Sequence, residues 1–254
     1  MRTEERHLLE RWHLLVNDLK AIPHLPIHLD LDLEKLRQEA SQVTDFFPHL
    51  LHKNKDLPEW YLKQHQNSFQ GQCLVDYVPD NIKGMADAPG HLFEEEDAQF
   101  DERGRLQFFI TPLGKKMPYT LSALRKISPY VNRTRLIKSP PGGGINWHSH
   151  HNGLYDVSYL RLCIFNIPLY TNPQCVHRVR SHQLKEKGAV YSEHYKAGQI
   201  YLFNSWHEHD FWNQGESSRL TIIPYFNFPD EELLQFLEKQ VELYDGPRIE
   251  ELDQ

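Results

Sequence analysis

Two clusters of histidine, separated by about 60 residues, carry the side chains most suited to binding a metal. The first is "INWHSHHNG", with His148, His150 and His151, and the second is "SWHEHDFW", with His207 and His209. Neutral imidazole is a good ligand for iron, zinc, copper and nickel. Two distant strands of a β-barrel can bring such ligands to one mouth, so we predict a metal site.

The spacing within the first cluster leaves the choice of metal open. A His-x-carboxylate pair with a distant His forms the facial triad of non-haem Fe(II) oxygenases, but here His150 stands in the carboxylate position. Because residues i and i+2 share a strand face, His150 is the candidate third ligand and His151 points away. A structural zinc or a chance cluster of surface histidines stays open, and Asp156 is a weaker candidate ligand.

Arg219 is a charged residue in a stretch, "SRLTII", that otherwise has the pattern of a core strand. A buried guanidinium needs an anionic partner, and its planar fork matches a carboxylate in bidentate fashion. Thr221 lies on the same strand face and offers a hydroxyl. A dicarboxylate that reaches from Arg219 to the metal satisfies both residues; an internal salt bridge to Asp or Glu is the alternative.

The elements that position these residues are short, β-rich segments that begin near residue 131 and are separated by turn signals such as "PPGGG", "TNPQ" and "NQGES". This rhythm indicates an antiparallel sandwich or barrel such as a jelly roll. The seven segments are "RTRLIKS", "LRLCIFNIPLY", "CVHRVRS", "AVYSEHY", "QIYLFNS", "HDFWNQ" and "RLTIIPYFNF".

Helices flank this β-rich region on both sides. Apolar residues at helical spacing predict a helix over residues 4–20, and "LEKLRQEASQVTDFF" (33–47), "GKKMPYTLSALRKI" (114–127) and "PDEELLQFLEKQVELY" (229–244) predict three more. Residues 48–105 are expected to form loops with short strands.

We therefore expect one mainly β domain with flanking helices. It comprises an N-terminal helical and loop region (1–117), a jelly-roll catalytic core (118–228) and a C-terminal helix and tail (229–254).

Composition excludes several classes of protein. A net charge of −7 and a pI of about 6.1 argue against a nucleic-acid binder. The sequence has no apolar run long enough to span a membrane, and the charged N-terminus is not a signal peptide. Three widely spaced cysteines do not form a disulfide framework, so a cytoplasmic location is expected. Mixed Glu and Arg on the polar face of the first helix favour packing against the core or a homodimer contact.

Several motifs in order resemble the aspartyl/asparaginyl β-hydroxylase family of Fe(II)/2-oxoglutarate oxygenases. They are "PGGGINWHSH", "LRLCIFNIP" and "GQIYLFNSWHEHDFWNQGESSRLTIIPYF", and they cover about residues 118–228. Pro141-Gly142 precedes His148 by the interval typical of the family, and Arg219 follows His209 by ten residues.

The resemblance implies a double-stranded β-helix (cupin-like jelly roll) that binds Fe(II) through His148 and His209, with 2-oxoglutarate as cosubstrate and Arg219 on its far carboxylate. It also favours His209 over His207 as the ligand. Arg161 is a candidate second guanidinium for the near carboxylate or the substrate. Many relatives have Asp, and some Gly, at the position of His150. The third ligand is then His150 or water, or the metal is not iron.

The expected function is hydroxylation of an amino acid or of an Asp/Asn-type peptide side chain, with O2 consumed and succinate and CO2 released. Trp147, Trp206 and His207 are candidate substrate-pocket residues, and the tryptophans are equally typical of a plain core. A three-His cupin dioxygenase that does not use 2-oxoglutarate is one alternative. A non-catalytic, metal-bound jelly-roll binding module is another.

Overall fold

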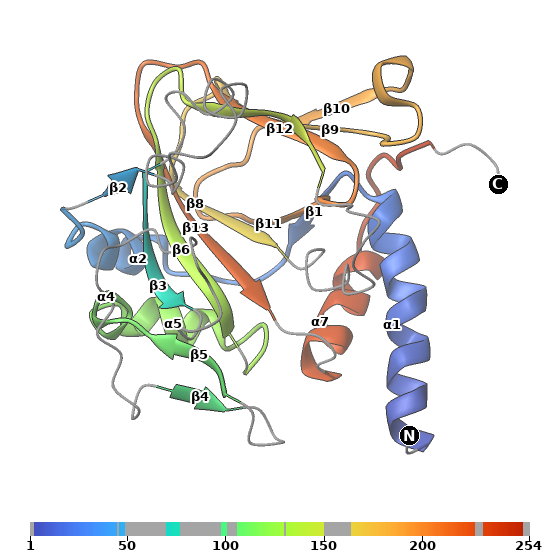
Figure 1. Ribbon diagram of the computed structural model, residues 1–254, viewed down its shortest axis with the longest axis horizontal. Helices are drawn as coiled ribbons and strands as arrows, with labels where there is room; N and C mark the ends of the chain where they lie inside the picture. The colour runs from blue at the N-terminus through green and yellow to red at the C-terminus, as the bar shows by residue number, and fades with distance from the viewer. Residues whose placement is uncertain are drawn as a thin grey trace, which may run out of the picture.

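The structure is a computed structural model that describes residues 3–44, 46–48, 70–76, 98–100, 106–129, 131–149, 164–226 and 231–250 (Figure 1). Its helices are α1 (Thr3–Ala21), α2 (Leu33–Ala40), α4 (Pro112–Lys115), α5 (Pro118–Leu124), α7 (Glu231–Glu242) and the short 3-10 helix η4 (Lys185–Lys187). Its strands are β1 (His24–Ile27), β2 (Phe47–Pro48), β3 (Gln70–Asp76), β4 (Ala98–Phe100), β5 (Leu106–Ile110), β6 (Val131–Ser139), β7 (Gly144–His148), β8 (Phe165–Tyr170), β9 (Cys175–Arg180), β10 (Val190–Glu193), β11 (Ile200–Phe203), β12 (Glu208–Asn213) and β13 (Arg219–Phe226).

The strands form two antiparallel sheets, which confirms the predicted mainly β jelly-roll class. Among the described residues, the large sheet has nine strands in the order β1-β11-β8-β13-β6-β3-β5-β4, with β2 beside β3. The small sheet has four, in the order β10-β9-β12-β7. Figure 1 shows the small sheet above the large one, with the helices at the far side of the large sheet.

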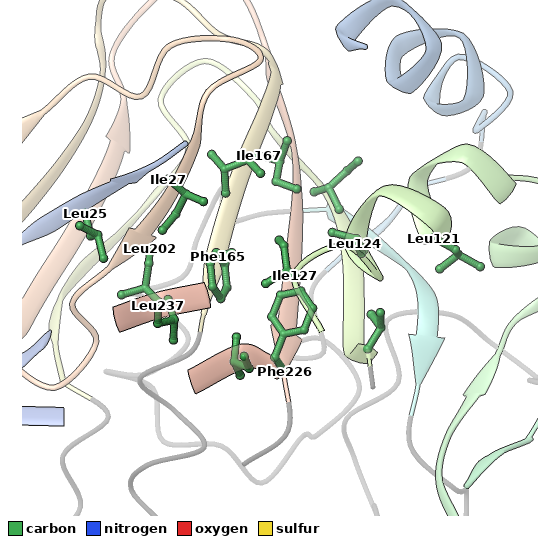
Figure 2. Close-up of a cluster of buried hydrophobic side chains, with 14 of the residues drawn as sticks. Leu25, Ile27, Leu121, Leu124, Ile127, Phe165, Ile167, Leu202, Phe226 and Leu237 are labelled. Atoms are coloured by element: carbon green, nitrogen blue, oxygen red, sulfur yellow. The ribbon is translucent and has the colours of Figure 1, made fainter. Parts of the chain in front are cut away.

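The hydrophobic core lies between the large sheet and the helices (Figure 2). Strand alternation sends Leu25 and Ile27 of β1 and Leu202 of β11 to this side, where they meet Leu237 of α7. The opposite face of the same strands is turned toward the small sheet. Polar side chains on that inner face can therefore gather between the sheets without interrupting the core.

The four predicted helices are present, with two corrections. The second ends at Ala40, capped by Ser41, and residues 47–48 belong to β2. The third is two short helices, α4 and α5, which Met117 separates with φ −121° and ψ 54°. Pro118 explains this break, because a residue before proline avoids the α conformation while proline itself suits the first helical turn.

Helix α1 matches the prediction and packs against α7, with Trp12, Leu15, Val16 and Leu19 almost fully buried. Within residues 48–105, β3 is more than a short loop strand, since it lies between β6 and β5 in the large sheet. None of the helices in the described residues is both long and apolar enough to cross a bilayer.

Candidate functional site

The turn that precedes β7 is docked on the end of β12. Gly142 has φ +73°, a conformation that side chains with a Cβ seldom adopt. Its N–H donates to the carbonyl oxygen of Asn213 at 2.8 Å, and the Asn213 N–H donates back to Gly143 O at 2.8 Å. The "PPGGG" sequence thus fixes where β7 begins relative to β12.

Gly144, the first residue of β7, lets the two strands approach closely. A Cβ at this position would lie 2.4 Å from the carbonyl oxygen of Phe211 and 2.6 Å from the ring of Trp212. Neither contact is sterically allowed, and backbone cannot move aside as a flexible side chain can. Glycine is therefore required for the spacing between β7 and β12.

The structure brings together His148 and His209, the two histidines selected from the sequence. They are direct cross-strand partners in the β7–β12 ladder. Their ring centroids are 4.2 Å apart and the ring planes are tilted by 56°. A histidine nitrogen binds a transition metal at roughly 2.0–2.1 Å, so both rings can reach one ion.

Both rings are oriented by the same kind of hydrogen bond. Nδ1 of His148 lies 2.8 Å from the carbonyl oxygen of Asn146, and Nδ1 of His209 lies 3.0 Å from that of His207. A carbonyl accepts only, so Nδ1 of each neutral ring carries the proton and the lone pair is on Nε2. This tautomer is the one that metal-binding histidines adopt when their other nitrogen donates to a carbonyl.

Burial lowers the pKa of His148, although the Asn146 carbonyl and the Asp210 carboxylate raise it in part. The ring is therefore neutral near pH 7, as metal binding requires.

The described residues do not place a third side chain beside His148 and His209 as a metal ligand. Within the described ranges no group of three His, Cys, Asp or Glu side chains is arranged to hold a metal. His150, His151, Asp156 and Arg161 all lie outside those ranges. The pair His148 and His209 is thus the part of the predicted metal site that the structure positions.

Arg219, the first residue of β13, is 2% exposed and lies between the two sheets. Its Nη2 donates to Asn166 Oδ1 at 2.9 Å, and its guanidinium lies over the Phe211 ring at 4.8 Å. Its Nε is buried and has no hydrogen-bond partner among the described residues. Burial lowers the pKa of Arg219 to about 10, so the side chain is still a cation near pH 7.

The alternative to a bound dicarboxylate, an internal salt bridge, is absent from the described part of the chain, where no Asp or Glu pairs with Arg219. Thr221 is fully buried on the same face of β13, and its hydroxyl lies 3.4 Å from Asn166 Oδ1. Asn166 thus links the two residues that the sequence selected as an anion site. A buried cation with an orphaned donor and a neighbouring hydroxyl fits a carboxylate ligand.

Three predicted pocket residues are not brought to the histidine pair. His207 precedes β12 and is fully buried, with Nε2 3.0 Å from the carbonyl oxygen of Lys20 and Nδ1 2.9 Å from Nδ1 of His182. Trp206 has the ammonium of Lys20 over its ring at 3.7 Å. Both therefore attach the β11–β12 loop to the end of α1.

Trp147 belongs to the outer face of the small sheet, opposite His148. The guanidiniums of Arg178 and Arg180 lie 5.1 and 4.3 Å from its ring centroid. Arg178 also pairs with Asp210, and Arg180 pairs with Glu208 at 2.7 Å. This places Glu208 and Asp210 on the side away from His209, as strand alternation predicts.

Sequence reasoning missed Asn166, Phe211 and His177, which line the space between the sheets. Asn166 had a detectable signal, because it is an amide inside the apolar run "LCIFNIPLY". His177 lies in "CVHRVRS", where alternation of apolar and basic residues concealed which face it occupies.

No family model and no curated protein matches this chain. Among solved structures, a 2OG-Fe(II) oxygenase family oxidoreductase from Burkholderia pseudomallei aligns with a TM-score of 0.50 at 9% identity, over 86% of this chain and 91% of that one.

A Trichoplax adhaerens prolyl hydroxylase, solved with a hypoxia inducible factor peptide, aligns with a TM-score of 0.45 at 14% identity. The alignment covers 97% of this chain and 98% of that one. A Pseudomonas putida prolyl-4-hydroxylase aligns with a TM-score of 0.44 at 12% identity, over 85% of this chain and 98% of that one. The fold of this chain is the double-stranded β-helix of the Burkholderia oxygenase.

Proposed function

We propose that the protein is an Fe(II)/2-oxoglutarate-dependent oxygenase that hydroxylates an amino acid or an Asp/Asn-type peptide side chain. The observation that carries this proposal is the shared location of two features. A cross-strand histidine pair and a buried guanidinium, which no acidic side chain of the described residues pairs with, lie in the same space between the sheets. Either feature alone would suit a zinc protein or an anion-binding protein.

The residues present fit both a metal ion and 2-oxoglutarate. His148 and His209 would hold the metal, and Arg219 with Thr221 would hold the far carboxylate of 2-oxoglutarate. With O2, the bound metal and cosubstrate supply the oxidising chemistry that converts a C–H bond to C–OH and yields succinate and CO2. Phe203, 5.2 Å from the His209 ring, and Phe211 give this space apolar walls that exclude water.

The assignment to the aspartyl/asparaginyl β-hydroxylase type is supported by the order and spacing of the Pro-Gly turn, His148, His209 and Arg219. Two observations support this assignment: the turn is hydrogen-bonded to the end of β12, and the guanidinium of Arg219 lies over Phe211, two residues from His209 in β12. His150 is our candidate for the third ligand and Arg161 for the near carboxylate.

The test begins with metal content after anaerobic loading of Fe(II). His148→Ala and His209→Ala should each lose most of the metal, at least tenfold in affinity, because each removes one of the two proposed ligands. His207→Ala is the matched control: it removes a neighbouring buried histidine whose ring contacts His182 and the Lys20 carbonyl at the end of α1, so metal content should fall far less. Loss of metal in His207→Ala alone would show that the wrong histidine has been assigned.

Turnover separates the alternatives. Succinate release with amino acids or Asp/Asn peptides supports the proposal. O2 consumption without succinate would indicate a three-His dioxygenase, and metal binding without O2 consumption would indicate a binding module. Metal titration of His150→Gly and His150→Asp then decides the third ligand: complete loss in His150→Gly establishes three histidines, while equal affinities place His150 outside the coordination sphere.

A further inference from the structure

His177 lies one step from the metal-binding pair, in the direction of Arg219. In the small sheet His209 faces Val179, Phe211 faces His177 and Asn213 faces Cys175. Residues two apart in a strand share a face, so His209, Phe211 and Asn213 of β12 all point toward the interior. His177 points the same way from the neighbouring strand β9. The guanidinium of Arg219 lies over Phe211, at the same level as His177.

Packing holds the His177 imidazole in one orientation. Its ring stacks on Tyr195 with centroids 4.0 Å apart and planes 13° from parallel, and lies 4.6 Å from the Phe211 ring on another side. Tyr195 is itself fixed, because its hydroxyl lies 2.8 Å from Nδ1 of His24. A side chain locked in this way is organised for a contact before any ligand arrives.

Two buried nitrogens in this region lack a hydrogen-bond partner within the described residues: Nε2 of His177 and Nε of Arg219. His177 is 8% exposed and Arg219 is 2% exposed, so water does not readily satisfy either atom. Both side chains pack against the same ring, Phe211, at 4.6 and 4.8 Å. Buried polar atoms are almost always paired, so a shared acceptor between them accounts for both.

We propose that His177 is a second donor to the carboxylate that Arg219 binds, and that it makes the site select a dicarboxylate over a monocarboxylic 2-oxo acid. This inference rests on the proposed function, which supplies the dicarboxylate. Burial lowers the pKa of His177 well below its usual value, so the ring is neutral and carries one N–H. With this proton on Nε2, His177 adds a directed hydrogen bond without adding a second charge next to Arg219.

The test is calorimetric binding to the protein loaded with Zn²⁺, which requires no turnover. The probes are 2-oxoglutarate and 2-oxobutanoate, which share the metal-chelating end but differ in the far carboxylate. His177→Phe keeps a ring to stack on Tyr195 and removes the donor. This substitution should lower the affinity for 2-oxoglutarate about tenfold or more, and it should change the affinity for 2-oxobutanoate less than about twofold.

His177→Gln restores an N–H donor and should bind 2-oxoglutarate within about threefold of the wild type. His194→Gln is the control, since His194 is a nearby histidine whose Nδ1 lies 3.1 Å from the Cys175 carbonyl oxygen, and it should bind both probes as the wild type does. If His177→Phe does not fold, the Nε2 resonance of ¹⁵N-labelled His177 in the wild type takes its place, and 2-oxoglutarate but not 2-oxobutanoate should shift it.

The failures of the two proposals are distinguishable. If wild type does not bind 2-oxoglutarate, or Arg219→Met does not weaken it, the cosubstrate site of the proposed function is wrong. If Arg219→Met weakens binding and His177→Phe does not, only the role of His177 is overturned. Equal weakening of both probes in His177→Phe would also overturn it, because a loss of general packing does not depend on the far carboxylate.

Discussion

Arg219 is a cation in the protein interior with one amide, one ring and no acidic neighbour in the described residues. Such a group is retained at a cost, because the free energy of removing a charge from water is not recovered by neutral partners. A buried cation of this kind is expected in a binding site for an anionic ligand. The ligand-free protein should therefore be less stable than its packing alone would allow.

We predict that Arg219→Met raises the free energy of unfolding of the ligand-free protein by about 1–3 kcal/mol, since a flexible apolar side chain fills the same space without a charge. The same variant should lose the stabilisation that millimolar 2-oxoglutarate gives to the wild type. Urea unfolding with and without 2-oxoglutarate measures both effects.

The matched control is Arg178→Met, which removes the partner of the buried Asp210 carboxylate and should lower stability. A less stable Arg219→Met protein would mean that the guanidinium is already satisfied without a ligand.

Most of the site residues that the structure positions could be selected from the sequence. The two histidine clusters and Arg219 stood out by residue type and strand pattern, which are local signals, and the family resemblance then selected His148 and His209 through the Pro-Gly turn and the ten-residue interval. Asn166 and His177 were not selected, since their importance depends on which distant strands become neighbours. Trp147 was assigned to the pocket from its chemical type, and its place beside Arg178 and Arg180 depends on strand register.

Among the elements, the contact between β7 and β12 has the most direct effect on the site. Gly144 lies four residues from His148, yet it determines how near β7 can come to the strand of His209. We predict that Gly144→Ala lowers metal affinity about tenfold by moving the two rings apart, with a smaller effect on stability than on metal binding.

Gly188→Ala is a suitable comparison, because the three atoms nearest to a Cβ there belong to the side chain of Leu184, at 2.9 Å at the closest, and not to backbone. Metal titration of both variants measures the difference. Wild-type metal affinity in Gly144→Ala would show that the strands can separate without disturbing the pair.

Element boundaries were predictable where a local signal was strong. Asp32 caps α2 by accepting from the Lys35 N–H at 3.1 Å, and helical spacing alone located α1. The split between α4 and α5 was missed because the apolar pattern continues across Pro118. The central place of β3 in the large sheet could not be foreseen, since it arises from pairing with β6 more than 50 residues away.

For the molecule as a whole, buried neutral histidines tie stability to pH. Burial lowers the pKa of His24 from 6.5 to about 4 in the folded protein, although the Tyr191 carbonyl raises it in part. Between these values the unfolded chain binds the proton and the folded protein does not, so acid favours unfolding.

We predict that the free energy of unfolding falls as pH decreases from about 6.5 to about 4, with His24 contributing up to about 3 kcal/mol of the loss. Urea unfolding at several pH values gives the slope, and His24→Gln should make it shallower. Parallel curves for the two proteins would assign the acid sensitivity to other groups.

The packing of α1 on α7 has a consequence for how the chain acquires its structure during synthesis. Arg11 of α1 pairs with Glu231 and Glu238 of α7, each at 2.6 Å, and Trp12 is buried among the core residues. These partners are more than 200 residues apart in the sequence. At roughly 5–20 residues per second, the ribosome would expose the apolar stripe of α1 for on the order of 10–40 s before α7 emerges. Helix α1 therefore docks on α7 long after it has been synthesised, and its apolar stripe is a segment that a chaperone could shield in the meantime.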